Sequence, residues 1–296
     1  MGLQTFKNFK RSLLNFQGKT MQENDRDELD FKLWSELRDA TLDQLHRELE
    51  SDSRDRRYAA ARILHSSGEK STLQIALKLA NSPSSDQREV AAFVMGQLPG
   101  LDLYSRNIVI NILSDMLEGD SQGLVRSSAA SALGHLNAVE KLQALSAGAL
   151  DQEKDVRASV AFAAGQIDTP ETAKLLIDLS HDQDREVAEW AALGLANGSN
   201  VSNNLIRKRL AELTEHSSRE VRETAITALA KLGDTSVVPA LLSALEDNDV
   251  SLSVVDAAGQ LGDRRALPLL IDMVRGCQGN VPSVLLDSIE KLGATK

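Results

Sequence analysis

The sequence predicts an all-α solenoid of about eight helical hairpin repeats, preceded by a short capping helix. Its clearest unit is Glu220–Asp234, where apolar or small residues stand four, seven, eight and eleven positions after Val221. These positions form one stripe on a helix, and that stripe must be buried against a partner. The same frame returns from Val125 and from Val156. Periodic copies of such a unit indicate repeats that stack around a continuous core.

Composition supports many small helices. Charged residues make up 26% and aromatic residues only 3% of the 296 residues, which suits thin aliphatic layers. The net charge of −10 argues against a primary role on nucleic-acid phosphates and favours solubility or a basic partner. Cys277 is the only cysteine, which excludes a disulfide framework within the chain. We find neither a signal peptide nor a long apolar run, so we expect a cytoplasmic protein without stable membrane insertion.

At the N-terminus we expect a basic arm and polar link over residues 1–28, and the solenoid over 29–296. Residues 1–20 contain four basic and no acidic residues, with Phe and Leu at loosely helical spacing. A frayed arm is favoured over a helix on a membrane surface, because the segment is short. A helix at Asp30–Arg38, with Trp34 as its apolar anchor, is expected to cap the first repeat.

Each repeat is expected to contain a first and a second helix. The eight pairs are Thr41–Glu50 and Arg56–Ser67; Ser71–Ala80 and Gln87–Leu98; Leu103–Glu118 and Leu124–Leu136; Glu140–Leu150 and Asp155–Ile167; Pro170–Ser180 and Glu186–Ala196; Asn203–Leu213 and Glu220–Leu232; Ser236–Glu246 and Val250–Leu261; Arg265–Val274 and Val281–Leu292. The frame origins of successive second helices, the positions that correspond to Val221, lie 29 to 38 residues apart. The outlying value of 38 marks insertions near Pro99–Asp102 and Gly119–Gly123.

Two further features of the frame are structural. Position nine carries a small residue, as at Gly134, Gly165 and Ala230, which should let neighbouring helix backbones approach closely. Position one carries arginine in five repeats, near acidic turns; the five are Arg57, Arg88, Arg126, Arg157 and Arg222. We expect a ladder of Asp–Arg hydrogen bonds that links successive repeats and is interrupted at Ala188 and Ser251.

The pattern Asp-x-x-x-Val-Arg-x-x-Ala-x-x-Ala-Leu-Gly-x-Leu-Gly-Asp resembles the bacterial HEAT repeat of the phycobilisome-lyase type, over residues 41–296. This resemblance implies a right-handed, HEAT/armadillo-like superhelix. Trp190-Ala191-Ala192 and the stretch from Ala257 to Leu270 resemble the YibA-like group of HEAT proteins, of which some members are regarded as immunity proteins of Rhs-type toxins.

We find no catalytic constellation in the sequence. Gly18-Lys19-Thr20 resembles the end of a phosphate-binding loop, but the required first glycine is replaced by Leu13. The five histidines stand singly, without HExxH or His-Glu pairs. We therefore expect no enzyme activity, no cofactor, no metal and no small-molecule substrate.

The resemblance implies that second helices line a concave face, with frame positions two, three, six and ten pointing into the groove. The candidate partner-binding residues are Tyr58, Arg62, Glu89, Phe93, Phe162, Glu189, Trp190, Leu193, Glu223 and Asp256. Aromatic anchors among charges are typical of protein interfaces. Alternatively, the aromatic residues pack between second helices as core. Both alternatives stay open for Phe93 and Phe162, whereas Trp190 favours the interface and Tyr58 the core.

The expected function is a non-enzymatic scaffold that binds another protein in its groove, with a basic toxin domain as one candidate partner. A phycobilin-lyase-like subunit is an alternative that only the repeat type suggests. A HEAT-like nucleic-acid-binding protein is another, but the groove positions hold only Arg62 and Lys231 as cations, against several acids.

Overall fold

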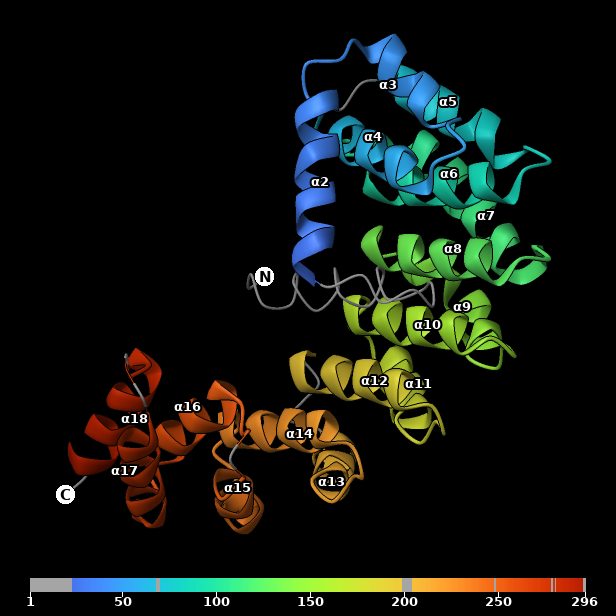
Figure 1. Cartoon of the computed structure of the whole chain (residues 1–296). Helices are drawn as coiled ribbons and strands as arrows, with labels where there is room; N and C mark the ends of the chain where they lie inside the picture. Colours follow the sequence, from blue (N-terminus) through green and yellow to red (C-terminus); the bar gives the residue numbers. More distant parts are fainter. Residues whose placement is uncertain are drawn as a thin grey trace. The chain divides into compact units, whose positions relative to one another are not determined.

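The computed structural model describes residues 23–67, 70–198, 204–247, 249–277, 279 and 281–294. Within these residues the chain forms 17 α-helices and three short 3-10 helices, without a strand (Figure 1). The all-α solenoid prediction is thereby confirmed. The chain divides into two compact units, Met1–Ser67 and Gly68–Lys296, which we describe separately. The basic arm predicted over residues 1–20 lies outside the described residues.

Unit 1 contains three described helices, α2 (Glu23–Leu37), α3 (Leu42–Glu48) and α4 (Arg54–Ser67), with α2 and α3 both packed on α4. The capping helix α2 is longer than predicted, so the expected polar link is helical from residue 23. Acidic residues at its start favour a helix N-terminus through the helix dipole, a signal that the apolar pattern does not carry.

The buried anchor of α2 also differs from the prediction. Leu33 and Leu37, one helical turn apart, are buried, whereas Trp34 is 46% exposed. Trp34 lies beside Phe31 at a ring-centroid distance of 6.1 Å, and the Arg38 guanidinium lies 5.4 Å from its ring centroid. The two leucines therefore cap the first repeat.

Unit 2 continues the alternation of first and second helices. The first helices are α5 (Lys70–Ala80), α7 (Leu103–Gly119), α9 (Leu142–Gly148), α11 (Pro170–Leu179), α13 (Asn204–Leu213), α15 (Val238–Leu245) and α17 (Leu267–Gly276). The second helices are α6 (Ser85–Gln97), α8 (Gly123–His135), α10 (Lys154–Gln166), α12 (Arg185–Asn197), α14 (Arg219–Lys231), α16 (Leu252–Leu261) and α18 (Ser283–Ala294). Three first helices are preceded by 3-10 turns, namely η1 (Val139–Lys141), η3 (Thr235–Val237) and η4 (Arg264–Ala266).

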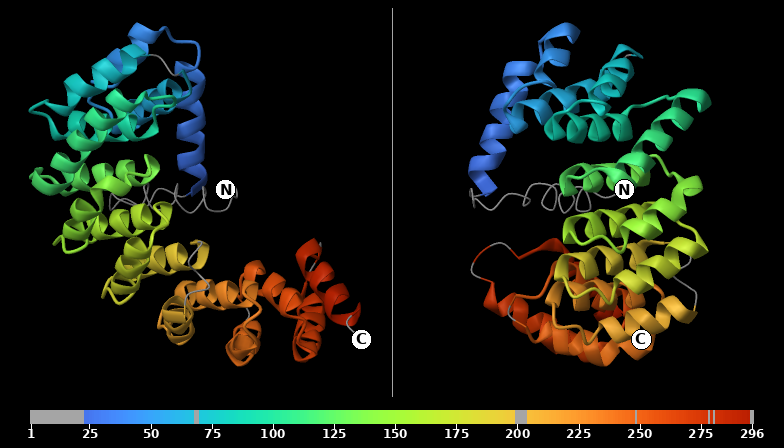
Figure 2. Two further views of the ribbon diagram at one scale, coloured as in Figure 1. Left: turned by 180° about the vertical axis from the view of Figure 1, so that it is seen from behind. Right: turned by 90° about the vertical axis from the view of Figure 1, so that its right-hand side faces the viewer.

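The second helices of unit 2 lie side by side, each packed on the next, from α6 to α18. The first helices cover one side of this layer of second helices. Unit 2 is curved, and the second helices line the inner side of its curve (Figures 1 and 2). The longest first helix is α7, with 17 residues, which accounts for the insertion inferred from the repeat spacing. Because each second helix packs on the next, the second helices form one continuous surface.

Close approach between second helices depends on the small residue at position nine. A Cβ atom added to Gly96 would lie 2.5 Å from the Ala132 Cβ, and one added to Gly134 would lie 2.6 Å from the Ala163 Cα. Gly165 likewise faces Gly194. In each case position nine of one helix meets position seven of the next. The prediction from the sequence is confirmed, with the partner position now identified.

The Asp–Arg ladder is confirmed over three successive rungs. Arg126 donates from Nε and Nη2 to the two carboxylate oxygens of Asp151 at 2.7 and 2.9 Å, and from Nη1 to the carbonyl of Asp120. The same geometry joins Arg88 to Asp120 and Arg157 to Asp182. Each arginine thus binds its own preceding turn and the turn of the next repeat. The remaining two arginines bind backbone carbonyls, Arg57 that of Ser51 and Arg222 those of His216 and Ser217.

Candidate functional site

The predicted groove residues divide between the two units. Tyr58 and Arg62 lie on α4 of unit 1, and the other eight lie on second helices of unit 2. Tyr58 is only 7% exposed, and the Arg54 guanidinium lies 4.7 Å from its ring centroid. Arg62 forms an ion pair with Asp30 at 3.2 Å. Tyr58 is therefore part of the core of unit 1, the alternative that the sequence favoured for it.

An aromatic row crosses three second helices of unit 2. We use this name for His135 on α8, Phe162 on α10 and Trp190 on α12. The centroid of the Phe162 ring lies 5.2 Å from that of His135 and 5.5 Å from that of Trp190, both with edge-to-face geometry. Such pairs contribute about 0.5–1.5 kcal/mol beyond their burial. The row runs diagonally across the three helices, because His135, Phe162 and Trp190 occupy frame positions ten, six and three.

The predicted partner-binding residues of unit 2 differ in how much of their side chain is exposed. Phe162 is 8% and Glu89 4% exposed, so both pack between helices. Phe93, Trp190 and Leu193 are half-buried and keep part of their surface accessible. Of these three, Trp190 and Leu193 lie one turn apart on the same helix, α12, so this pair best fits a contact surface.

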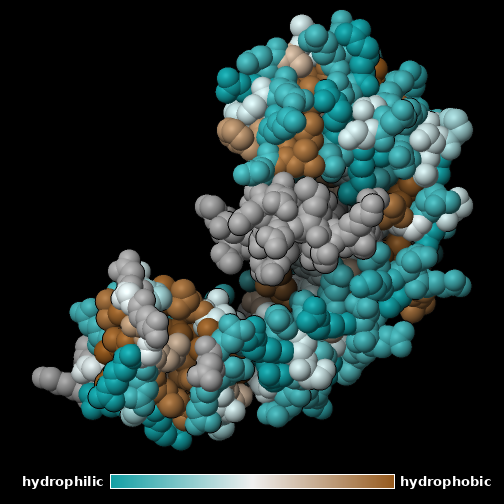
Figure 3. Space-filling view, viewed as in Figure 1, coloured by the Kyte–Doolittle hydropathy of each residue, from teal (hydrophilic) through white to brown (hydrophobic). Residues whose placement is uncertain are grey.

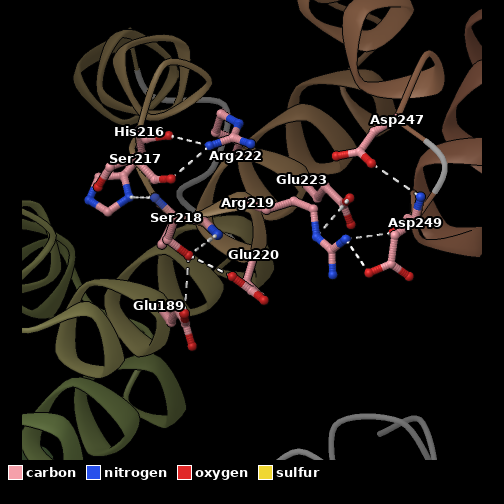
Figure 4. A network of polar contacts seen from close by, with 11 residues as sticks. Glu189, His216, Ser217, Ser218, Arg219, Glu220, Arg222, Glu223, Asp247 and Asp249 are labelled. Atoms are coloured by element: carbon pink, nitrogen blue, oxygen red, sulfur yellow. Dashed lines mark hydrogen bonds and ion pairs between the residues drawn. The ribbon is translucent and has the colours of Figure 1, made fainter.

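Glu189 precedes Trp190 and belongs to a polar network between α12 and α14 (Figure 4). Its carboxylate lies 3.3 Å from Arg185 Nε and 3.2 Å from the Ser218 hydroxyl. The same hydroxyl lies 2.8 Å from Glu220, and it can donate to only one carboxylate at a time. Burial raises the pKa of Glu189, opposed by the charge of Arg185. A carboxylate that is costly to ionise is thus held next to Trp190.

The acidic residues Glu223 and Asp256 lie on the next two second helices. Glu223 is paired weakly with Arg219 at 3.9 Å, while Arg219 Nη1 binds Asp249 at 2.6 Å (Figure 4). Asp256 accepts hydrogen bonds from Gln260 Nε2 at 2.6 Å and from Lys291 Nζ at 3.2 Å. These carboxylates follow Glu189 along the same layer of helices.

His216 occupies a position that sequence reasoning missed. In the turns before α10 and α12, the carboxylates of Asp151 and Asp182 accept the N–H of the residue two positions later. In the turn before α14, His216 Nδ1 accepts the Ser218 N–H at 3.0 Å. At frame position one of the preceding second helix, α12, Ala188 stands where α8 and α10 have arginine. A carboxylate at position 216 would lack that arginine partner, and the neutral imidazole of His216 avoids this unpaired charge. Burial and the charges of Arg209 and Arg222 lower the pKa of His216.

The stretch of the second-helix layer over α12, α14 and α16 has accessible side chains on each of its three helices, and we call it the inner strip. Its members share frame positions three, six and ten: Trp190, Leu193, Asn197, Thr224, Thr227, Lys231, Ser253, Asp256 and Gln260. Asn197, Lys231, Ser253 and Gln260 are exposed, and the other five are half-buried. The apolar members of the strip lie on α12, whereas its members on α14 and α16 are hydroxyl, amide and charged residues. Leu252, Ile271 and Leu286 are exposed in the C-terminal repeats, where the face drawn in Figure 3 also shows apolar residues at the surface.

Metal-ligating and membrane-spanning features were also sought in the described part of the chain. There we find no group of three or more His, Cys, Asp or Glu side chains arranged to hold a metal ion. None of the helices described has both the length and the apolar character needed to span a bilayer.

Comparison with known proteins identifies relatives over most of the chain. A family model for HEAT repeats matches residues 110–196 and 206–283. The protein YibA from Escherichia coli is 28% identical over 269 residues, which cover 89% of this chain and 95% of YibA. The X-ray structure of Escherichia coli YibA superimposes with a TM-score of 0.70 at 26% identity, covering 95% of this chain and all of that chain.

A more distant similarity is found to the complex of CpcE and CpcF of phycocyanin lyase from Nostoc sp. Its TM-score is 0.48 at 16% identity, covering 77% of this chain and 96% of that chain. Similarity at this level carries no argument about activity.

Proposed function

Since the chain belongs to the HEAT-repeat family, we propose that it is a non-enzymatic protein-binding scaffold whose partner contacts the second helices of unit 2. Stacked helical repeats create extended surfaces that protein partners use. The observation that supports this proposal most directly is the half-buried pair Trp190 and Leu193 on α12, with Glu189 adjacent to Trp190 in the sequence. Tryptophan contacts of this kind dominate the binding energy of many interfaces.

Charge indicates what kind of partner would be favoured. The net charge of −10 attracts a basic partner over distances near the Debye length and raises its association rate. Carboxylates also lie on three neighbouring second helices, at Glu189, Glu223 and Asp256, and each is paired with a basic side chain that a basic partner would have to displace. Burial of apolar contacts would then supply affinity, while the acidic residues would supply orientation.

The finer proposal is that this bacterial protein acts in the cytoplasm as an immunity protein, and that its partner is a basic toxin domain of the Rhs type. Its support is the identity of 28% to YibA over nearly the whole chain, together with the negative charge. Binding would neutralise the toxin by covering its active surface. Co-expression tests this directly: a cognate toxin domain that kills cells should be tolerated when this chain is present.

The general proposal is tested by affinity capture from the native cell. The tagged chain is compared with a Trp190→Ala, Glu189→Lys variant. A matched control, Tyr104→Ala with Glu171→Lys, likewise replaces one aromatic residue and one glutamate, at exposed positions on first helices. Circular dichroism first establishes equal helicity for all three proteins.

We expect wild type and control to capture one shared partner and the Trp190 variant to lose it. Capture of that partner by all three proteins would place the contact elsewhere and refute the proposal.

A further inference from the structure

We propose that the C-terminal end of unit 2 is a contact surface for a second copy of this chain, and that the two copies meet about a twofold axis. The surface, which we call the terminal face, consists of Leu267, Ile271 and Val274 on α17 and of Leu286 and Glu290 on α18. These two helices form the last layer of the array (Figure 1). The inference does not depend on the inner strip or on the proposed scaffold function.

Leu286 lies on the side of α18 on which earlier second helices bind the next one. Position nine of a second helix meets position seven of the next, and Gly259 of α16 meets Ser288 of α18 in this way. Position five lies one turn before position nine on the same side. On the six earlier second helices of unit 2, position five is at most 2% exposed: Ala92, Ala130, Ala161, Ala192, Ile226 and Val255. Leu286 holds position five in α18 and is 50% exposed.

The first helix of the last repeat is also less covered than its predecessor. In α15 three apolar residues are buried: Val238, Leu241 and Leu245. The corresponding residues of α17 are Leu267, Leu270 and Val274, of which only Leu270 is buried. Ile271, next to Leu270, is 37% exposed. Repeat arrays need a polar outer face at their ends to stay soluble, so an apolar end indicates a surface that a partner covers.

Glu290 excludes a further repeat of the same kind as this partner. Position nine is glycine or alanine on the six earlier second helices of unit 2: Gly96, Gly134, Gly165, Ala196, Ala230 and Gly259. In α18 the exposed side chain of Glu290 holds this position. It would block the close approach by which each second helix receives the next, so the partner must meet α18 in another geometry.

An antiparallel pairing of α18 with the α18 of a second copy gives Glu290 a favourable position. If the twofold axis passes beside Leu286, the leucines of the two copies meet. Glu290, four residues later, then lies opposite Pro282 and Ser283 of the other copy. Ser283 is the first residue of α18, so each carboxylate faces the positive end of a helix dipole. The same axis brings the two α17 helices together.

Charge favours contact between copies at this end of the chain. The whole chain carries a net charge of −10, whereas its last repeat, residues 263–296, contains four acidic and five basic residues. Two copies therefore repel each other through the remainder of their surface and least through their last repeats.

The size of the terminal face indicates a reversible contact. With 10 and 12 residues, α17 and α18 are about 15–18 Å long, and each is about 10 Å wide. A contact over two such helices lies at the low end of specific interfaces, so we expect a dissociation constant on the order of 10 μM.

Sedimentation velocity of the full-length chain, from about 1 to about 200 μM, measures this association. Leu286→Asp is compared with Leu103→Asp, which changes an exposed leucine on α7. Glu290→Lys is compared with Glu118→Lys, which changes an exposed glutamate near the C-terminal end of α7. Circular dichroism first establishes equal helicity for all variants.

We expect wild type and both controls to dimerise alike. Leu286→Asp should weaken the dimer roughly 25-fold, because each copy loses a leucine contact worth roughly fivefold. Glu290→Lys should weaken it roughly tenfold, because attraction to a helix N-terminus becomes repulsion in both copies.

A crosslinking experiment tests the antiparallel geometry. Packed helix axes lie about 8–10 Å apart and Cα atoms about 2.3 Å from each axis, so facing Cα atoms come within about 5 Å, a distance that a disulfide can span. In a Cys277→Ser background, Leu286→Cys should give a covalent dimer in a glutathione redox buffer, and Leu103→Cys should not.

A wild-type chain that stays monomeric at the highest concentration would overturn the inference and leave the terminal face to a different occupant. A dimer that Leu286→Asp does not weaken, or equal crosslinking from both positions, would overturn it by placing the contact elsewhere. A dimer that is weakened by Leu286→Asp but not by Glu290→Lys would refute the antiparallel arrangement.

Discussion

The contact between position nine and position seven of neighbouring second helices gives the most quantitative stability prediction. In the variant Gly134→Ala, the new Cβ would lie 2.6 Å from the Ala163 Cα and 2.9 Å from its Cβ. Carbon atoms normally make contact at about 3.5–4.0 Å, so α8 and α10 must separate by roughly 1 Å. Overpacking of this kind costs about 1–3 kcal/mol.

Alanine also favours a helix over glycine by up to about 1 kcal/mol, which partly offsets this cost. The control variant Gly119→Ala removes that ambiguity, because Gly119 also lies at the end of a helix and an added Cβ there meets no atom within 4 Å. We expect Gly134→Ala to be less stable than Gly119→Ala by about 1–3 kcal/mol.

Urea unfolding followed by circular dichroism measures this difference. Hydrogen exchange of the α8 and α10 amides tests whether the loss is local, as expected for stacked repeats. Equal stability of the two variants would refute the close-packing explanation of position nine.

Three further predictions concern charge. Asp151→Asn should lower the free energy of unfolding by about 2 kcal/mol at pH 7, because Arg126 loses a charge-assisted bidentate partner. Burial alone would raise the pKa of Asp151, but Arg126, the Glu153 N–H and Arg157 together lower it. The stability that the Asp151 carboxylate contributes is therefore present above about pH 4 and is lost as the pH falls through its lowered pKa. Urea unfolding curves of wild type and variant at a series of lower pH values should therefore converge. Glu189→Gln should be more stable than wild type at pH 7 and lose this advantage below pH 4, since burial raises the pKa of Glu189 and its ionisation opposes folding; a pH series of unfolding curves measures this. Finally, DNA affinity that falls steeply with added salt would contradict the expected preference for a protein partner, and we expect none by anisotropy at 150 mM salt.

The sequence predicted the repeats well because each helix carries its own evidence. The spacing of apolar residues within one helix, the glycines at helix ends and the acidic residues in the turns are all local signals. They located each helix pair to within a few residues. The small residue at position nine and the arginine at position one are also local, so close packing and the ladder could be inferred before the structure.

Burial of individual groove residues could not be predicted in the same way. The family resemblance predicts that frame positions two, three, six and ten point into the groove, but whether a side chain stays accessible there depends on the neighbouring helix. Phe162 is buried against its neighbours, whereas Trp190 on the next helix is only half-buried. A single helix frame does not contain that information.

His216 illustrates a second limit. The sequence shows the absence of arginine at Ala188, but it does not show that the turn before α14 replaces aspartate with histidine in the same capping geometry. Only the hydrogen bonds of successive turns relate the loss of arginine at Ala188 to the histidine at position 216. In α2, similarly, periodicity alone did not distinguish buried Leu33 and Leu37 from exposed Trp34.

The central claim, that partners contact the inner strip, is tested most directly by site-specific photo-crosslinking. Benzoylphenylalanine replaces Leu193 on α12 in one protein and Leu150, 85% exposed after α9, in the other. Both are expressed in the native cell and irradiated there. We predict a single crosslinked partner from position 193 and none from position 150. Crosslinking from position 150 alone would contradict the claim and assign binding to the outer surface.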